Sequence, residues 1–258
     1  MNKTAQNRIE EIKKNGYTLD FGNVFNLAFE NYKKIALYGG LVFFVFAVAF
    51  SLAGIVVLFS IFDTEMILEN LKPERFKPEN MDVNSILIFS AFSIIITCLL
   101  SPFSGGLIKM AYCAEKDEEF HVSTMFEYYK PPYFKELFVA TFLVTLMNSV
   151  IGGLLNYIQI PILDVVVSVT IGLFTILMIP LIIFGDLKAI EAIQTSLLIV
   201  SKQPLVLLGL LVVGYIGTMV GFIGCCIGIF FTLPFIYSLY FAIYSEIIGF
   251  DPEDDTIN

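Results

Sequence analysis

Long stretches without a charged residue constrain this chain more than any other feature. Residues 35–62 contain no Asp, Glu, Lys or Arg, and neither do residues 203–245. About 20 apolar residues cross the hydrocarbon of a bilayer as an α-helix, so the first run is long enough for one span and the second for two. Lipid offers no partner to backbone N–H and C=O groups, so each span must satisfy them internally. We therefore expect an all-α integral membrane protein.

The composition favours a membrane protein over a soluble one. Hydrophobic residues make up 57% of the chain, charged residues only 15%, and the mean hydropathy is +0.81. The formal net charge of -9 comes from acids gathered in residues 63–82, 115–119 and 251–255, which are predicted loops and a tail. No basic patch is interleaved with aromatic residues, so nucleic acid is not an expected partner. The expected partner is the lipid bilayer.

Six spans follow from the apolar runs. They are predicted at residues 35–62, 86–112, 137–155, 165–184, 204–222 and 226–246. The last two are divided by a glycine-rich stretch, Gly217, Gly221, Gly224 and Gly228, which allows a tight turn. We expect a single membrane domain over residues 18–250, preceded by a polar, solvated N-terminal extension at 1–17 and followed by an acidic tail at 251–258.

An amphipathic segment precedes every second span. From Asp20, a predicted helix cap, apolar side chains recur with a helical period up to the first span, and similar segments end at 126–130 and begin at Asp186. Each is expected to lie at the membrane surface before the chain turns into the bilayer. This pattern predicts three repeated units at about 18–114, 119–186 and 187–250. The sequence leaves open whether the third segment lies on the surface or continues into the fifth span.

Each returning span carries one proline, at Pro102, Pro180 and Pro234. A proline inside a helix removes a hydrogen bond, so these positions are predicted helix kinks. Ser101, Asn148 and Thr232 are the candidate polar groups of a central cavity. The alternative is that they bond to backbone groups or to neighbouring helices. Ionisable residues lie only at predicted span ends, which argues against a proton-coupled pump.

The distribution of basic residues predicts the orientation. Residues 1–34, 109–135 and 186–203 hold twelve of the fifteen Lys and Arg residues. The positive-inside rule then places both termini in the cytoplasm, for a multi-pass protein of a bacterial cytoplasmic (inner) membrane. Lys33, Lys34 and Lys130 follow amphipathic segments on that side, and we expect them to contact lipid headgroups.

The residues that carry chemistry are few. His121 is the only histidine, and no second metal ligand or catalytic partner is placed near it by the sequence. The four cysteines, Cys98, Cys113, Cys225 and Cys226, have no metal-binding spacing and suit packing positions in membrane helices. We therefore expect no catalytic residue, no cofactor and no metal, and a protein that is not an enzyme.

With this topology, the chain resembles the membrane domain attached to some glycerophosphodiester phosphodiesterases and its stand-alone prokaryotic relatives. The similarity lies in the amphipathic helix at 25–34 and in a unit like residues 189–204. It covers most of residues 18–250 and rests on pattern more than on fixed motifs. It implies a six-span membrane fold without the soluble catalytic barrel, and it transfers no functional residues.

Two functions remain after these exclusions. The first expectation is a non-enzymatic scaffold or accessory subunit, with a membrane protein or a second copy of the chain as its partner. Three interfacial segments and an acidic tail are its candidate docking surfaces. The alternative is a transporter or lipid-handling protein with a groove between its transmembrane hairpins, by analogy with repeated transporter folds.

Overall fold

The computed structural model describes residues 3–61, 83–223 and 227–250. Within these ranges all regular structure is helical, and six helices are long and apolar enough to cross a membrane. They cover Phe21–Val56, Ile86–Glu115, Tyr133–Tyr157, Pro161–Ile183, Pro204–Ile223 and Gly228–Ile247. The predicted all-α, six-span architecture is confirmed. The predicted tail at 251–258, Cys225, Cys226 and most of the predicted loop at 63–84 lie outside the described residues.

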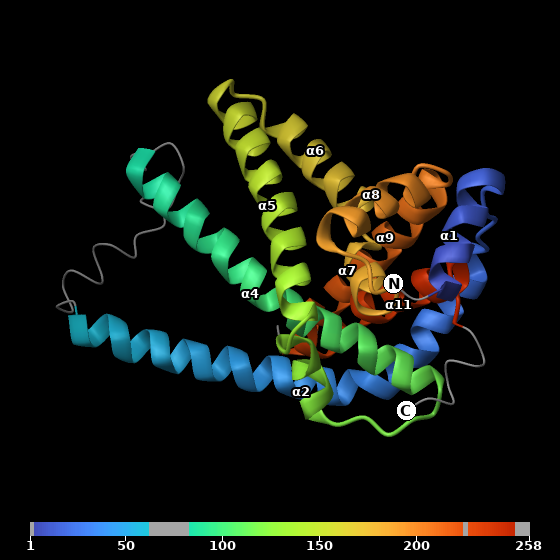
Figure 1. Cartoon of the computed structure of the whole chain (residues 1–258). Coiled ribbons are helices and arrows are strands. Elements are labelled where there is room, and N and C mark those ends of the chain that lie inside the picture. The colour runs from blue at the N-terminus through green and yellow to red at the C-terminus, as the bar shows by residue number, and fades with distance from the viewer. Residues whose placement is uncertain (1–2, 62–82, 224–226, 251–258) are drawn as a thin grey trace.

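The elements follow one another along the chain as in Figure 1. They are α1 (Lys3–Asn15), α2 (Phe21–Ile61), α4 (Val83–Glu115), η3 (Val122–Tyr129), α5 (Tyr133–Tyr157), α6 (Pro161–Phe174), α7 (Met178–Ile183), α8 (Ala189–Val200), α9 (Pro204–Met219), η4 (Val220–Ile223), α10 (Gly228–Thr232) and α11 (Pro234–Ile247). The fourth span thus consists of α6 and α7, and the sixth of α10 and α11. Two of the six spans are interrupted helices.

The first amphipathic segment and the first span form one helix. Helix α2 runs for 41 residues, about 60 Å at 1.5 Å per residue, without a break near Lys34. Asp20 caps its start as predicted, because the Asn23 backbone N–H donates to Asp20 Oδ1 at 2.8 Å. The predicted turn into the membrane at this point is wrong. No proline lies near Lys34, so nothing interrupts the backbone hydrogen bonds of the helix.

The N-terminal extension is folded rather than solvated. Ala5, Ile9 and Ile12 lie on one side of α1 and are buried in the hydrophobic core, where α1 packs against α8. The guanidinium Nε of Arg8 donates to the Ile247 carbonyl at 3.1 Å, which ties α1 to the end of α11. The prediction of a solvated segment was wrong because three small or branched apolar residues form a stripe too narrow to stand out among charges.

The other two amphipathic segments take different forms. The second is the 3-10 helix η3, which buries Met125 and Tyr128. The third is α8, a separate helix that the residues 201–203 divide from α9, so it does not continue into the fifth span. Asp186 does not cap it, because α8 begins at Ala189 and Lys188 is its N-cap residue. The Asp186 carboxylate accepts a hydrogen bond from the Tyr133 hydroxyl at 2.9 Å. Since the three predicted units begin with different structures, the internal repeat stays a prediction.

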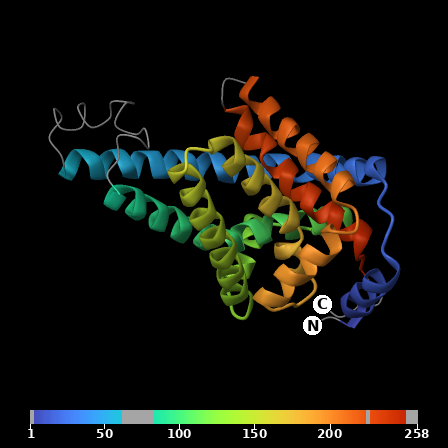
Figure 2. The same cartoon turned by 90° about the horizontal axis from the view of Figure 1, so that it is seen from above.

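The core lies where α11 packs along α2 and α4. Gly39 lets the helices approach closely, because a Cβ at this position would meet Pro234 Cγ at 2.7 Å. Aromatic rings also pack between α2 and α11. The rings of Tyr32 and Phe235 lie edge to face, with 5.4 Å between their centres. The C-terminal half of α2 and the N-terminal half of α4 extend beyond this core in both views (Figures 1 and 2). Their exposed apolar side chains suit contact with lipid.

Candidate functional site

A cavity with hydroxyl and amide groups in its wall lies among three of the spanning helices. It has a volume of about 730 Å³ and opens between α4, α5 and α6. Seven of its thirteen lining residues carry a hydroxyl or an amide: Ser90, Ser93, Thr97, Thr145, Asn148, Ser149 and Ser168. The others are Ile86, Phe89, Ile94, Val144, Ile171 and Gly172. We call this cavity the hydroxyl groove.

Helical periodicity gathers these side chains on facing surfaces. On α4, Ser90, Ser93 and Thr97 recur at spacings of three and four residues, which place them on one face. Thr145, Asn148 and Ser149 do the same on α5. On α6, Ser168 and Gly172 are one turn apart, so the hydroxyl lies next to a position without a side chain.

Asn148 connects two walls of the hydroxyl groove. The Ser168 hydroxyl donates to Asn148 Oδ1 at 3.1 Å, which joins α6 to α5. Among the residues that the structure describes, none accepts a hydrogen bond from the Asn148 amide nitrogen. Asn148 is half-buried and lines the groove, so its two amide hydrogens are available to whatever fills the groove.

The threonines of the groove are partly satisfied by their own helices. The Thr97 hydroxyl donates to the Ser93 carbonyl at 2.9 Å, and the Thr145 hydroxyl donates to the Thr141 carbonyl at 2.7 Å. Hydroxyls that bond back to the preceding turn keep their lone pairs, so they act as hydrogen-bond acceptors towards the groove. The groove therefore presents both donors and acceptors.

Helix α6 borders three cavities, of which the hydroxyl groove is one. Ser168 and Gly172 also line a second cavity of about 450 Å³ against α9, whose wall includes Leu208 and Tyr215. A third cavity of about 180 Å³ lies between α5, α6 and α8. An added Cβ at Gly172 would meet no atom within 4 Å, which confirms the open space beside this glycine.

A buried serine secures the break between α6 and α7. Ser196 on α8 is fully buried, and its hydroxyl donates to the Phe174 carbonyl at 2.7 Å. The Leu177 backbone N–H donates to the same hydroxyl at 3.3 Å. One side chain thus satisfies a carbonyl at the end of α6 and an N–H at the start of α7, groups that a broken membrane helix would otherwise leave unpaired.

The three predicted cavity residues do not share one cavity. Asn148 lines the hydroxyl groove, whereas Ser101 is buried and donates to the Cys98 carbonyl at 2.9 Å. The Thr232 hydroxyl donates to the Thr218 carbonyl at 2.6 Å and bridges α10 and α9. Sequence reasoning missed Ser90, Ser93, Thr145, Ser149 and Ser168. The three-and-four spacing of the α4 serines was a signal for them, but their facing partners on α5 and α6 were not evident.

The three prolines occupy different settings. Pro102 lies inside the uninterrupted helix α4. Pro180 is in the first turn of α7, after the break at residues 175–177. Pro234 is the first residue of α11, where its missing N–H is one that a helix start leaves unpaired.

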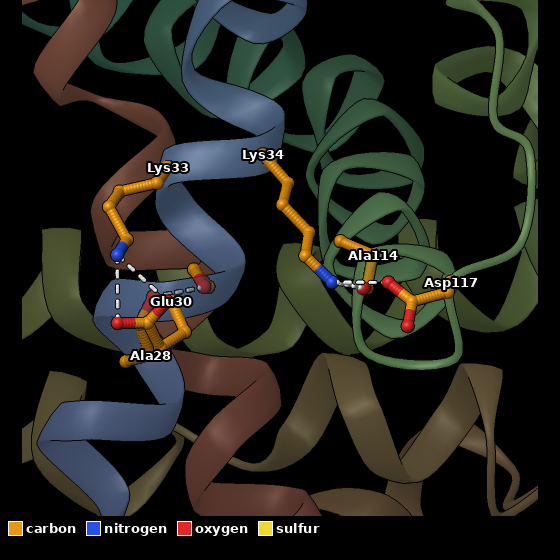
Figure 3. A network of polar contacts seen from close by, with 7 residues as sticks. Ala28, Glu30, Lys33, Lys34, Ala114 and Asp117 are labelled. Atoms are coloured by element: carbon orange, nitrogen blue, oxygen red, sulfur yellow. Dashed lines mark hydrogen bonds and ion pairs between the residues drawn. The ribbon is translucent and has the colours of Figure 1, made fainter.

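Two of the three predicted headgroup-binding lysines bond to the protein itself, as Figure 3 shows. Lys33 pairs with Glu30 at 2.8 Å and lies 5.5 Å from the centre of the Phe29 ring. Lys34 Nζ donates to the Ala114 carbonyl and to Asp117 Oδ1, both at 2.6 Å. Lys34 thus joins α2 to the C-terminal end of α4, where unpaired carbonyls favour a cation. Lys130 follows η3 and is exposed.

The three basic segments of the sequence meet at one end of the molecule. Besides Lys34 and Asp117, the Asn31 amide donates to Glu115 Oε2 at 3.0 Å. The Gln203 amide donates to the Tyr17 carbonyl, and the Tyr17 hydroxyl donates to the Ile199 carbonyl at 3.2 Å. These contacts connect residues 1–34, 109–135 and 186–203. Burial raises the pKa of Tyr17 to about 12.

Comparison with known proteins gives no match, so the groove is interpreted from its geometry. No protein-family model, no curated protein and no solved structure matches the chain. Within the described ranges, no group of three or more His, Cys, Asp or Glu side chains is placed to hold a metal ion. What the described residues do assemble is an uncharged, hydrogen-bonding groove in the membrane-spanning region.

Proposed function

We propose that this protein binds a lipid or another amphiphile in the hydroxyl groove, as a lipid-handling protein or transporter. The observation that carries the proposal is a row of hydroxyls and an amide facing a cavity of about 730 Å³ between membrane helices. Hydrocarbon chains cannot satisfy an amide with free hydrogens, so a molecule with its own polar atoms is the better occupant. The volume lies in the range of about 300–1,000 Å³ that is typical of small-molecule sites.

The walls of the groove fit an amphiphile. Phe89, Ile94 and Ile171 line it beside the polar residues, so an occupant meets apolar and hydrogen-bonding surfaces at once. We place the protein in a bacterial cytoplasmic membrane with both termini in the cytoplasm, which the basic residues gathered at one end support.

A steric block tests this proposal. We expect Gly172→Leu to fill the groove, because a side chain there enters open space beside Ser168. The protein would be purified from its native membrane in a lipid-preserving polymer, and the bound lipids measured by mass spectrometry. Wild-type protein should retain a lipid class whose bound amount is lower by roughly tenfold or more in Gly172→Leu. A tenfold loss corresponds to about 1.4 kcal/mol of binding free energy.

A matched control is Gly153→Leu. Gly153 is also an exposed helical glycine with no atom within 4 Å of an added Cβ, but it lies on α5 outside the groove. This variant should keep the wild-type lipid profile. If wild type and both variants carry the same lipids in the same amounts, the groove is not a binding site and the proposal is wrong.

A second candidate function is that of a scaffold or accessory subunit. One observation favours it: the outer halves of α2 and α4 reach beyond the other helices and expose large apolar side chains, with Phe50 at 72% exposure. Such a surface suits a membrane protein partner or a second copy of the chain as well as lipid. In the same purification, a stoichiometric protein retained by wild type and both glycine variants, without a selected lipid, would favour this function.

A further inference from the structure

We infer that the occupant of the hydroxyl groove is a lipid with an uncharged hydroxyl or ester headgroup, such as a diacylglycerol, and not an anionic phospholipid. This inference rests on the proposed function and adds the chemical class of the ligand. It follows from which polar groups line the groove, where they lie along the spans, and which groups are missing from the lining.

The lining has no charge. None of its thirteen residues is Asp, Glu, Lys, Arg or His. A phosphate brought into a membrane cavity needs a cation or several converging N–H donors to offset the loss of its hydration. The described lysines near α2 and α4 are at the polar end of the molecule, where Lys33 and Lys34 bond to Glu30 and Asp117. The groove therefore disfavours a phosphate.

The depth of Asn148 agrees with a neutral headgroup. At 1.5 Å per residue, Asn148 lies about 14 Å along α5 from Tyr157 and about 22 Å from Tyr133, well inside the span. Phosphates of membrane lipids stay in the hydrated headgroup region, whereas hydroxyl and ester groups lose less free energy when they move towards the hydrocarbon. A neutral headgroup can reach Asn148 at a lower desolvation cost.

The hydrogen-bond inventory matches ester and hydroxyl groups. The Asn148 amide nitrogen offers two donors that suit a carbonyl oxygen. The Thr97 and Thr145 hydroxyls, whose protons bond to their own helices, offer acceptors that suit an alcohol O–H. An ester-linked glycerol with a free hydroxyl carries both partners, and its acyl chains match Phe89 and Ile94.

The chain allows a direct test because it contains no tryptophan. Phe89→Trp places one fluorophore on the wall of the groove, and Phe50→Trp places one on the exposed outer half of α2 as a control. Each variant would be reconstituted in phosphatidylcholine vesicles. Dibrominated diacylglycerol or dibrominated phosphatidic acid with the same acyl chains would then be added as quenchers. The two quenchers differ only by the phosphate.

We expect diacylglycerol to quench the fluorescence of Phe89→Trp at about a fivefold lower mole fraction than phosphatidic acid, the scale of one net hydrogen bond. The Phe50→Trp control should report only the ordinary partitioning of the two lipids. Asn148→Leu in the Phe89→Trp background should weaken quenching by both lipids to the same extent, because both carry the ester carbonyls that the Asn148 amide suits. Ser168→Ala removes the same hydrogen bond between α5 and α6 but leaves the Asn148 amide in place, so it should retain most of the quenching.

The outcomes separate the two proposals. If phosphatidic acid quenches Phe89→Trp as strongly as diacylglycerol or more strongly, the inference about the headgroup is overturned while the groove remains a lipid site. If both lipids quench Phe89→Trp only as they quench the control, the inference is overturned together with the proposed function. Quenching that Asn148→Leu leaves unchanged would contradict the assigned role of this amide.

Discussion

At the scale of single residues, the same kind of side chain serves different purposes according to its neighbours. Thr232 bridges two helices, Ser101 bonds within its own helix, and Ser196 holds together the ends of a broken span. Tyr17 shows the same dependence at the polar end, where its ring is partly buried and its hydroxyl bonds to α8. Residue type alone does not distinguish these roles, because each depends on which backbone group lies within reach.

The pKa of Tyr17 leads to a prediction about alkaline stability. Burial raises this pKa from 10.0 to about 12, which favours the neutral phenol in the folded state. Tyr17 therefore stabilises the fold fully below pH 10 and loses this contribution as the pH rises from 10 to 12. We expect Tyr17→Phe to show a smaller decline in thermal unfolding midpoint across this range than wild type.

The control for this measurement is Tyr157→Phe, since Tyr157 is 87% exposed and lies at the opposite end of α5 from the polar end. Its decline should match that of wild type. At lower pH, where the phenol is neutral in both states, Tyr17→Phe should also cost about 0.5–1.5 kcal/mol for the lost hydrogen bond. Equal declines for all three proteins would show that Tyr17 does not titrate differently in the folded state.

At the scale of elements, the interrupted spans set the shape of the groove. The break at residues 175–177 allows α6 to leave the direction of α7 and to stand between α5 and α9 with a cavity on either side. Ser196 makes the break tolerable by pairing both freed backbone groups. The position of the groove wall therefore depends on a residue of α8 that does not line the groove.

Ser196→Ala should accordingly destabilise the protein by about 1–3 kcal/mol, the cost of leaving buried backbone groups unpaired. Unfolding by a denaturing detergent, followed by circular dichroism, measures this difference. Ser201→Ala is the matched control, since the Ser201 hydroxyl bonds to the Leu198 carbonyl at an exposed position. If Ser196→Ala lowers the free energy of unfolding no more than Ser201→Ala does, the break between α6 and α7 does not depend on Ser196.

At the scale of the whole molecule, the chain has one polar end and one apolar extension. Lys34, Arg8 and Gln203 join the N-terminal region to the α4–η3 connection, the end of α11 and the α8–α9 turn. The outer halves of α2 and α4 point away from this end (Figure 1). Basic residues at one end give the molecule a defined orientation in a membrane that follows the positive-inside rule.

Reporter fusions test this orientation. A green fluorescent protein fused after residue 250 should fluoresce, and alkaline phosphatase fused at the same point should be inactive, because we expect this end in the cytoplasm. A phosphatase inserted near Asp117 should be inactive as well, since Lys34 holds Asp117 at the same end. Active phosphatase at either position would reverse the predicted topology.

The sequence by itself determined the six spans and the all-α class, because membrane insertion depends on local hydrophobicity and length, which are properties of each segment alone. Only the tertiary structure decided that α1 packs through Ile9 and Ile12, that α2 continues past Lys34 without a break, and that Asn148 meets Ser168. The hydroxyl groove belongs to this second group. Its serines lie on three different helices, and only helix packing brings such side chains to one cavity.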